Sequence, residues 1–171
     1  MISQADIKKK EQEYREYIDT HRTNVAKAWE EVKFKCNSVL KERMSLVQFS
    51  LVESDIANHD LSKYSEEEFD AYRKWFHFVD ESEKDKEAFD KAWEHHYMNN
   101  PHHPNSWVKN NSKDLMPYVY IVQMVCDWQA MGYVFGNNAK EYYEKNKAEI
   151  QGKLGERQIK WTEELLNVLC E

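Results

Sequence analysis

The stretch between Leu115 and Phe135, LMPYVYIVQMVCDWQAMGYVF, constrains the fold of this chain more than any other segment. On a helix its residues are apolar almost all round, whereas a helix at a protein surface carries one polar face. Such a helix is normally the central one of its domain, with other helices packed around it. Gly136 and Asn137 follow directly and are typical of helix ends. We therefore expect a central apolar helix near residues 114–135.

The rest of the chain is predicted to form amphipathic helices. Between residues 5 and 36, apolar side chains recur every three or four positions, which places them on one face of a helix. Asp19 and Thr20 could cap a restart within this segment, so it forms either one helix or two. Comparable patterns predict further helices at 45–58, 65–78, 85–97, 139–147 and 156–170. With only four glycines, three prolines and little strand-like alternation, residues 1–171 are expected to form a single all-α domain of about six to seven helices.

The sequence SEEEF, residues 65–69, has the pattern of a helix start. Ser65 is the expected N-cap, and Glu68 three positions later would complete a capping box. One of Glu66, Glu67 and Glu68 could instead serve as a general acid, but helix capping explains Glu68 without any chemistry.

Charge and composition exclude several classes of partner. The net charge of −7 argues against a nucleic-acid duplex, because counterion release requires a basic surface. No apolar run approaches the roughly 20 residues that span a bilayer, and the charged N-terminus lacks the apolar centre of a signal peptide. The three cysteines are far apart, as expected for buried thiols in a reducing compartment. We expect a cytoplasmic protein that binds neither duplex nucleic acid nor membrane.

Four residues that can ligate a metal occupy unusual positions. His21 lies on the apolar stripe of the first predicted helix, and His59 and Asp60 are adjacent at the end of the second. Asp127 lies on the apolar central helix, where a carboxylate is costly to bury unless it is paired or binds a metal. Taken alone, Asp127 is equally well explained as a hydrogen-bonded core residue, and His21 is better explained in that way.

Helical phase distinguishes His96 from its neighbour His95. Phe89, Trp93 and His96 step by four and three along the predicted helix and therefore share its apolar face. We expect His96 to face the core and to be the ligand, with His95 more exposed. A phase error of one residue would reverse the two assignments.

Two more histidines, His102 and His103, lie between prolines in the sequence PHHP, residues 101–104. Proline restricts its own φ and the residue before it, so this motif could fix two imidazoles beside a site or could be a solvated loop. Imidazole and carboxylate ligands suit Mn, Fe, Zn, Co or Ni, and the sequence does not distinguish these metals. The predicted ligands, sufficient for one or two divalent ions, are His21, His59, Asp60, His96, His102, His103 and Asp127.

The order His … His-Asp … Asp on helices resembles the HD-domain superfamily of metal-dependent phosphohydrolases, here as His21, His59–Asp60 and Asp127. The sequence HDLSK is similar to the frequent His-Asp-x-x-Lys form of that superfamily, which implies a phosphate-side role for Lys63. The additional histidines resemble its binuclear branch, which includes the HD-GYP phosphodiesterases, although the GYP signature is absent. The wider pattern HDLSKYSEEEF … NPHHPNSW … MVCDWQAMGY also resembles a bacterial and phage family of small domains of unknown function.

The HD resemblance implies an HD-like helical bundle that hydrolyses a phosphomonoester or phosphodiester with a metal-activated water. The expected substrate is a nucleotide or another small phosphorylated metabolite. The ligands assigned to the first metal are His21, His59 and Asp127, and those assigned to a second are His96 with His102 or His103. Asp60 would bridge the two metals. Lys63 would neutralise charge on the phosphate, although most lysines on turns are simply solvated.

Two other functions fit the same ligand set. Some HD-fold proteins resemble this chain in their ligands yet hold two irons and activate oxygen, which would make it a di-iron oxygenase. Alternatively, a metal whose positions are all filled by protein groups would be a structural staple in a non-catalytic domain that binds a nucleotide or a protein. A homo-oligomer is compatible with any of these functions, and the sequence does not decide the oligomeric state.

Overall fold

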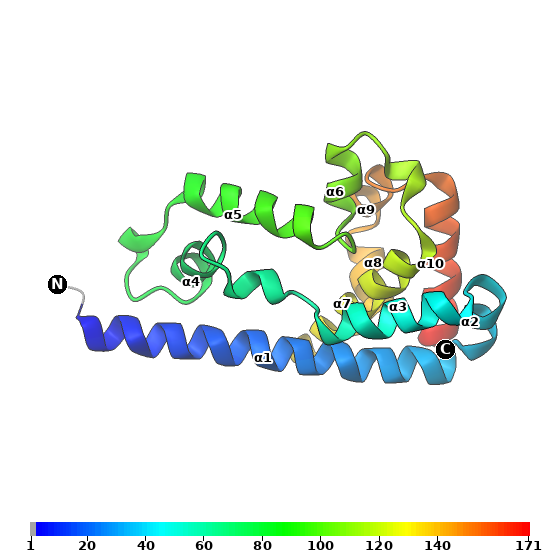
Figure 1. Cartoon of the computed structure of the whole chain (residues 1–171), viewed down its shortest axis with the longest axis horizontal. Coiled ribbons are helices and arrows are strands. Elements are labelled where there is room, and N and C mark those ends of the chain that lie inside the picture. The colour runs from blue at the N-terminus through cyan, green and yellow to red at the C-terminus, as the bar shows by residue number, and fades with distance from the viewer. Residues whose placement is uncertain (1–2) are drawn as a thin grey trace. The chain divides into compact units, whose positions relative to one another are not determined.

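The computed structural model describes residues 3–171, which form ten α-helices and three short 3-10 segments without any strand (Figure 1). This confirms the prediction of an all-α protein. In chain order the helices are α1 (Gln4–Lys35), α2 (Asn37–Arg43), α3 (Leu46–Ala57), α4 (Phe69–Phe76), α5 (Lys86–Asn99), α6 (Pro104–Lys109), α7 (Tyr118–Phe135), α8 (Ala139–Lys145), α9 (Lys147–Gly152) and α10 (Glu156–Leu169). The number of helices exceeds the expected six to seven. Three of them, α2, α6 and α9, are too short for their apolar residues to show a helical period in the sequence.

The chain divides into two compact units, each with a hydrophobic core of its own. Unit 1 comprises Met1–Thr20 and Asp60–Asn100, and unit 2 comprises His21–His59 and Pro101–Glu171. The helix α1 therefore contributes its first part to unit 1 and its remainder to unit 2. The prediction that residues 1–171 form a single domain stays a prediction.

The core of unit 2 is built around α7, which packs against α3, α8 and α10. Buried residues occur on every side of α7, as expected for the central helix of a domain. The helix begins after Pro117, later than predicted, because residues 113–115 form a separate 3-10 turn. It ends where predicted, since Gly136 adopts the left-handed conformation with a φ of 71°.

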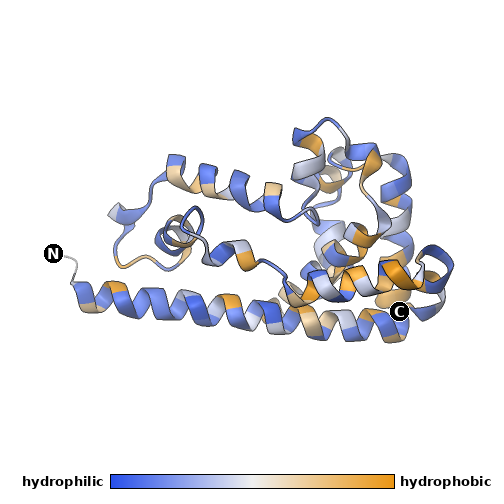
Figure 2. Ribbon diagram, in the orientation of Figure 1, coloured by the Kyte–Doolittle hydropathy of each residue, from blue (hydrophilic) through white to orange (hydrophobic). Residues whose placement is uncertain are grey.

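The core of unit 1 is small and aromatic. Most of the first part of α1 is hydrophilic in Figure 2, and only Tyr14 and Ile18 of that part are buried in the core. They form one cluster with Tyr72 of α4 and Ala92 of α5. α1 is a single continuous helix, so the restart considered at residues 19–20 does not occur.

The capping box predicted at Ser65 and Glu68 is wrong. Ser65 ends the 3-10 segment η1 (Leu61–Tyr64), and α4 begins only at Phe69 without any side-chain cap. The Glu68 carboxylate is buried and bonds to the side chain of His96 rather than to the start of the helix. A tertiary hydrogen bond has therefore replaced the local one that the sequence pattern favours.

Alanine substitutions at two helical glycines are expected to change the free energy of unfolding in opposite directions. A Cβ at Gly132 in α7 would lie 2.5 Å from the carbonyl oxygen of Asn137, so the turn that follows α7 must shift. Gly132→Ala should lower the free energy of unfolding by about 2 kcal/mol. A Cβ at Gly152 in α9 meets nothing within 4 Å, so Gly152→Ala should raise it by about 0.5 kcal/mol. Urea unfolding of the full chain measures both changes, and effects of equal sign would contradict this account.

The environment of the cysteines agrees with the prediction of unpaired thiols. Cys36 and Cys126 are buried, Cys170 is half-buried, and none is in a disulfide. Burial raises the pKa of the Cys36 thiol to about 11, which keeps it protonated near neutral pH. Within residues 3–171, no helix combines the length and the apolar character that crossing a membrane requires.

Candidate metal centre

Separate elements of unit 2 bring five of the predicted ligands to one place. His21 lies within α1, and His59 follows the end of α3, where Asn58 is the C-cap. His102 and His103 immediately precede α6, whose first residue is Pro104. Asp127 projects from the central helix α7. Three of these five side chains are nearly inaccessible to solvent, namely those of His21, His59 and His102.

The atoms of His21, His59 and Asp127 that can ligate a metal converge. His21 Nε2 lies 3.1 Å from Asp127 Oδ1 and 3.3 Å from His59 Nε2, and the distance from His59 Nε2 to Asp127 Oδ1 is 3.7 Å. Ligands bound at 2.0–2.1 Å in a tetrahedral site are separated by about 3.3 Å. The measured separations bracket this value, so these three side chains could hold a metal ion.

The PHHP loop packs against the same carboxylate. The ring of His102 stacks on that of His59 with centroids 4.4 Å apart, and the His103 ring lies 4.3 Å from the His102 ring. His102 Nε2 is 3.9 Å from Asp127 Oδ2, and His102, His103 and Asp127 form a second group that could hold a metal. The loop is thus part of the site, and the alternative of a solvated loop does not apply to His102, which is 3% exposed.

Asp127 is ionised in this setting. Burial by itself raises the pKa of a carboxyl group, and the Asp127 side chain is only 15% exposed. Hydrogen bonds and the electrostatic effect of His21 and His59 outweigh burial and hold the pKa of Asp127 well below its usual range. The group that the sequence analysis marked as costly to bury is therefore an anion in contact with two imidazoles.

Arg22 supports His59, a role that the sequence analysis missed. The last carbonyls of a helix have no partners within the helix, and those at the end of α3 are close to His59. Arg22 donates from Nη2 to the Ala57 carbonyl at 2.7 Å and from Nε to the His59 carbonyl at 3.0 Å. No sequence spacing signals this contact, because residues 22 and 59 meet only through packing.

Arg22→Ala is expected to weaken binding of a divalent metal by about 10- to 100-fold, the range for loss of a group that orients a ligand. The variant keeps every predicted ligand but removes the Arg22 hydrogen bonds to the Ala57 and His59 carbonyls. Titration of the purified chain with Zn²⁺ against a chromophoric chelator measures the affinity. Arg43→Ala is the matched control, because Arg43 bonds to Glu164 instead. Equal Zn²⁺ affinity of wild type and Arg22→Ala would contradict the assigned role.

Asp60 and Lys63, the predicted catalytic pair, form an ion pair in unit 1. Lys63 Nζ lies 2.7 Å from Asp60 Oδ2, and both side chains are largely buried. Lys63 is therefore not the solvated lysine that turns commonly carry. Asp60 has a φ of 54°, which non-glycine residues rarely adopt and which clusters at functional sites.

His96 is buried in unit 1 and His95 is half-exposed, as the helical phase predicts. His96 Nε2 lies 3.5 Å from Asp60 Oδ1, and its Nδ1 lies 2.9 Å from Glu68 Oε2. Burial raises the pKa of Glu68, but hydrogen bonds and the electrostatic effect of His96, with a further bond to His95, hold it below the usual value. Glu68 is the second residue that the sequence analysis missed, because a run of three glutamates conceals which one is buried.

The predicted site residues therefore fall into two sets. The set in unit 2 contains His21, His59, His102, His103 and Asp127. The set in unit 1 contains Asp60, Lys63 and His96.

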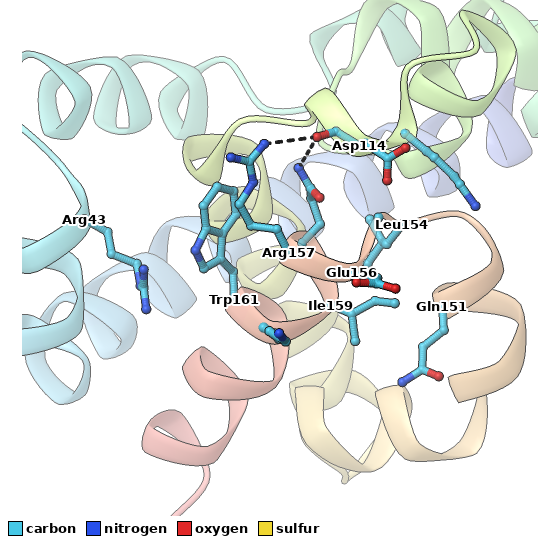
Figure 3. Close-up of a pocket in the computed structure, with 12 residues that line it drawn as sticks. Arg43, Asp114, Gln151, Leu154, Glu156, Arg157, Ile159 and Trp161 are labelled. Carbon is cyan, nitrogen blue, oxygen red and sulfur yellow. Dashed lines mark hydrogen bonds between the residues drawn. The ribbon is translucent and has the colours of Figure 1, made fainter.

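Unit 2 also has an open cleft of about 930 Å³ at the start of α10 (Figure 3). The backbone carbonyl of Asp114 accepts hydrogen bonds there from Arg157 at 3.3 Å and from Gln158 at 2.9 Å. None of the predicted site residues lines this cleft. Its size alone does not make it the functional site, because it lacks any group of converging metal ligands among the described residues.

Comparison with known families covers both sets of residues. A model of a family of unknown function, DUF5662, matches residues 10–169. The chain belongs to the DUF5662 family. Neither the curated proteins nor the solved structures contain a match to it. The description of DUF5662 names no activity.

Proposed function

We propose that this DUF5662 member is a metal-dependent phosphohydrolase of the HD type. The observation that carries the proposal is the convergence of His21, His59 and Asp127 within bonding reach of one divalent ion. The order of these ligands along the chain, with His59 directly before an aspartate, is the order that the HD resemblance requires. The proposed substrate is a phosphomonoester or phosphodiester of a nucleotide or another small metabolite.

The side chains of unit 2 suit the binding of such an ion. When bound, a divalent metal lowers the pKa of its water toward neutrality and polarises a phosphoryl oxygen. Asp127 contributes a negative charge at neutral pH because its pKa is held low. His21 and His59 contribute imidazole nitrogens. Catalytic sites keep a coordination position for water beyond three protein ligands, and the proposal requires such a position here.

Lys63 is proposed to neutralise the negative charge that develops on the phosphate. Its ammonium group is a compact point charge and is held in place by Asp60 at 2.7 Å. The bridging role of Asp60 between two metals stays a prediction from the HD resemblance.

The test is a metal analysis of the purified full chain followed by a screen for phosphate release. The chain is loaded separately with Mn, Fe, Zn, Co and Ni and is offered nucleoside monophosphates, cyclic nucleotides and sugar phosphates. We expect hydrolysis with at least one metal, loss of activity with a chelator, and recovery when the metal is restored. Metal binding without turnover over the whole panel would contradict the proposal. An iron chromophore that responds to oxygen would favour the di-iron oxygenase instead.

A further inference from the structure

The carboxylate of Glu68 is buried within unit 1 and bonds to two adjacent histidines. Its Oε2 lies 2.9 Å from Nδ1 of His96, and its Oε1 lies 2.7 Å from Nδ1 of His95. Glu68 is 0% exposed and His96 is 1% exposed, so water does not compete for the bond between them. Burial of a carboxylate is costly unless hydrogen bonds compensate for it. These two bonds, together with one from Ser62, compensate for burial of the charge.

The neighbours of His96 Nδ1 decide which ring nitrogen carries the proton. An ionised carboxylate only accepts hydrogen bonds, so the contact with Glu68 requires a hydrogen on Nδ1. Asn100 Nδ2 has two hydrogens, and its bonds to Ser62 Oγ at 2.7 Å and to the His96 carbonyl at 2.8 Å use both. Its 3.3 Å approach to Nδ1 therefore donates nothing to the ring. The Ser62 hydroxyl also lies 3.3 Å from His96 Nδ1. Because a carboxylate only accepts, this hydroxyl donates its hydrogen in its bond to Glu68.

We infer that Glu68 is a positioning residue that holds His96 as the Nδ1–H tautomer and turns the lone pair of Nε2 toward Asp60. Nε2 lies 3.5 Å from Asp60 Oδ1, while Lys63 bonds to the other oxygen, Oδ2. In the neutral ring, Nε2 and Oδ1 are two acceptors that face each other, an arrangement that suits a divalent cation. Carboxylate–imidazole pairs of this kind orient a ligand ring and raise its basicity. The identity of the cation rests on the proposed function, whereas the tautomer does not.

The tautomer is measured on metal-free protein by long-range ¹H–¹⁵N correlation of labelled histidine at mildly alkaline pH. In the wild type we expect the signature of a protonated Nδ1 and an unprotonated Nε2 for His96. Glu68→Gln removes the charge and turns one of the two acceptor oxygens into a donor NH2 group, so a hydrogen on Nδ1 is no longer required. We expect the Nδ1–H population to fall. Glu66→Gln, at an exposed position two residues away, removes the same charge and should leave the His96 signals unchanged.

A wild-type spectrum with the proton on Nε2 would overturn the inference by itself, even if Glu68→Gln does not fold. Identical His96 signals in the wild type and in folded Glu68→Gln would overturn it as well. Zn²⁺ titration of the same proteins supplies the second readout, and we expect Glu68→Gln to bind about 10- to 100-fold more weakly than Glu66→Gln. Absence of metal binding by the wild type would count against the proposed function alone, because the tautomer is read without metal.

Discussion

Asp127→Asn is expected to weaken binding of a divalent metal by more than about 100-fold, a larger loss than removal of an outer-shell partner causes. Asp127 is the anion shared by both groups of converging ligands in unit 2, one with His21 and His59 and one with His102 and His103. Asparagine keeps the size of the side chain but removes the charge. It also replaces one of the two acceptor oxygens by a donor NH2 group. Zn²⁺ titration and metal analysis of the purified variant measure the loss.

The control for this variant is Asp55→Asn. Asp55 is a partly buried aspartate of unit 2 that accepts a hydrogen bond from Gln123 at 2.8 Å and lies outside the metal groups. It should retain wild-type affinity for Zn²⁺. If Asp127→Asn binds Zn²⁺ as tightly as Asp55→Asn does, the centre in unit 2 is not the metal site, and the proposed function loses the observation that carries it.

Glu83→Ala is expected to lower the free energy of unfolding by about 3 kcal/mol, because it leaves a buried cation without its main partner. Arg73 is 1% exposed, and its Nη1 lies 2.9 Å and 3.1 Å from the two carboxylate oxygens of Glu83. Glu83 also accepts a bond from the Val79 backbone N–H at 2.6 Å, which ties the segment between α4 and α5 to the ion pair. Urea unfolding followed by circular dichroism measures the change.

Two further variants separate the cost of leaving the buried Arg73 charge without its partner from the cost of lost packing contacts. In the double variant Arg73→Met, Glu83→Leu both charges are absent, and we expect it to be more stable than Glu83→Ala. Lys91→Ala breaks an exposed pair with Glu87 in the same unit and should leave the unfolding midpoint unchanged. A double variant less stable than Glu83→Ala would show that packing, rather than the unpaired charge, sets the cost.

The same ion pair should make the stability of the protein sensitive to acid. Burial raises the pKa of Glu83, but bonds from the Val79 N–H and from Arg73 bring it below the usual value. The folded chain then binds this proton less readily than the unfolded chain. The stabilisation is therefore complete above the ordinary glutamate pKa of about 4.3 and is lost as the pH falls through the lowered value. The difference in unfolding midpoint between wild type and Glu83→Ala should accordingly shrink between pH 7 and about pH 3.5.

The long helices could be predicted well because the spacing of apolar residues along a helix is a local property of the sequence. α3 and α10 each bury residues spaced three to four apart, and α7 is apolar almost all round, so no distant partner is needed to recognise these helices. The start of α4 was misplaced because Ser65 and Glu68 carry a local capping signal that tertiary bonds override. Local signals thus located the long helices, but not the short helices α2, α6 and α9 or every boundary.

The candidate ligands could also be named from the sequence, because His21, His59 and Asp127 stand out against apolar or helix-end contexts. What each residue contacts could not be named. The bonds from Arg22 to the His59 carbonyl and from His96 to the Glu68 carboxylate join residues dozens of positions apart. Residue type and spacing alone thus determined an all-α chain with a set of side chains that can ligate a metal. Tertiary structure alone decided which nitrogens and oxygens converge, because hydrogen-bond geometry depends on packing between elements that no periodicity records.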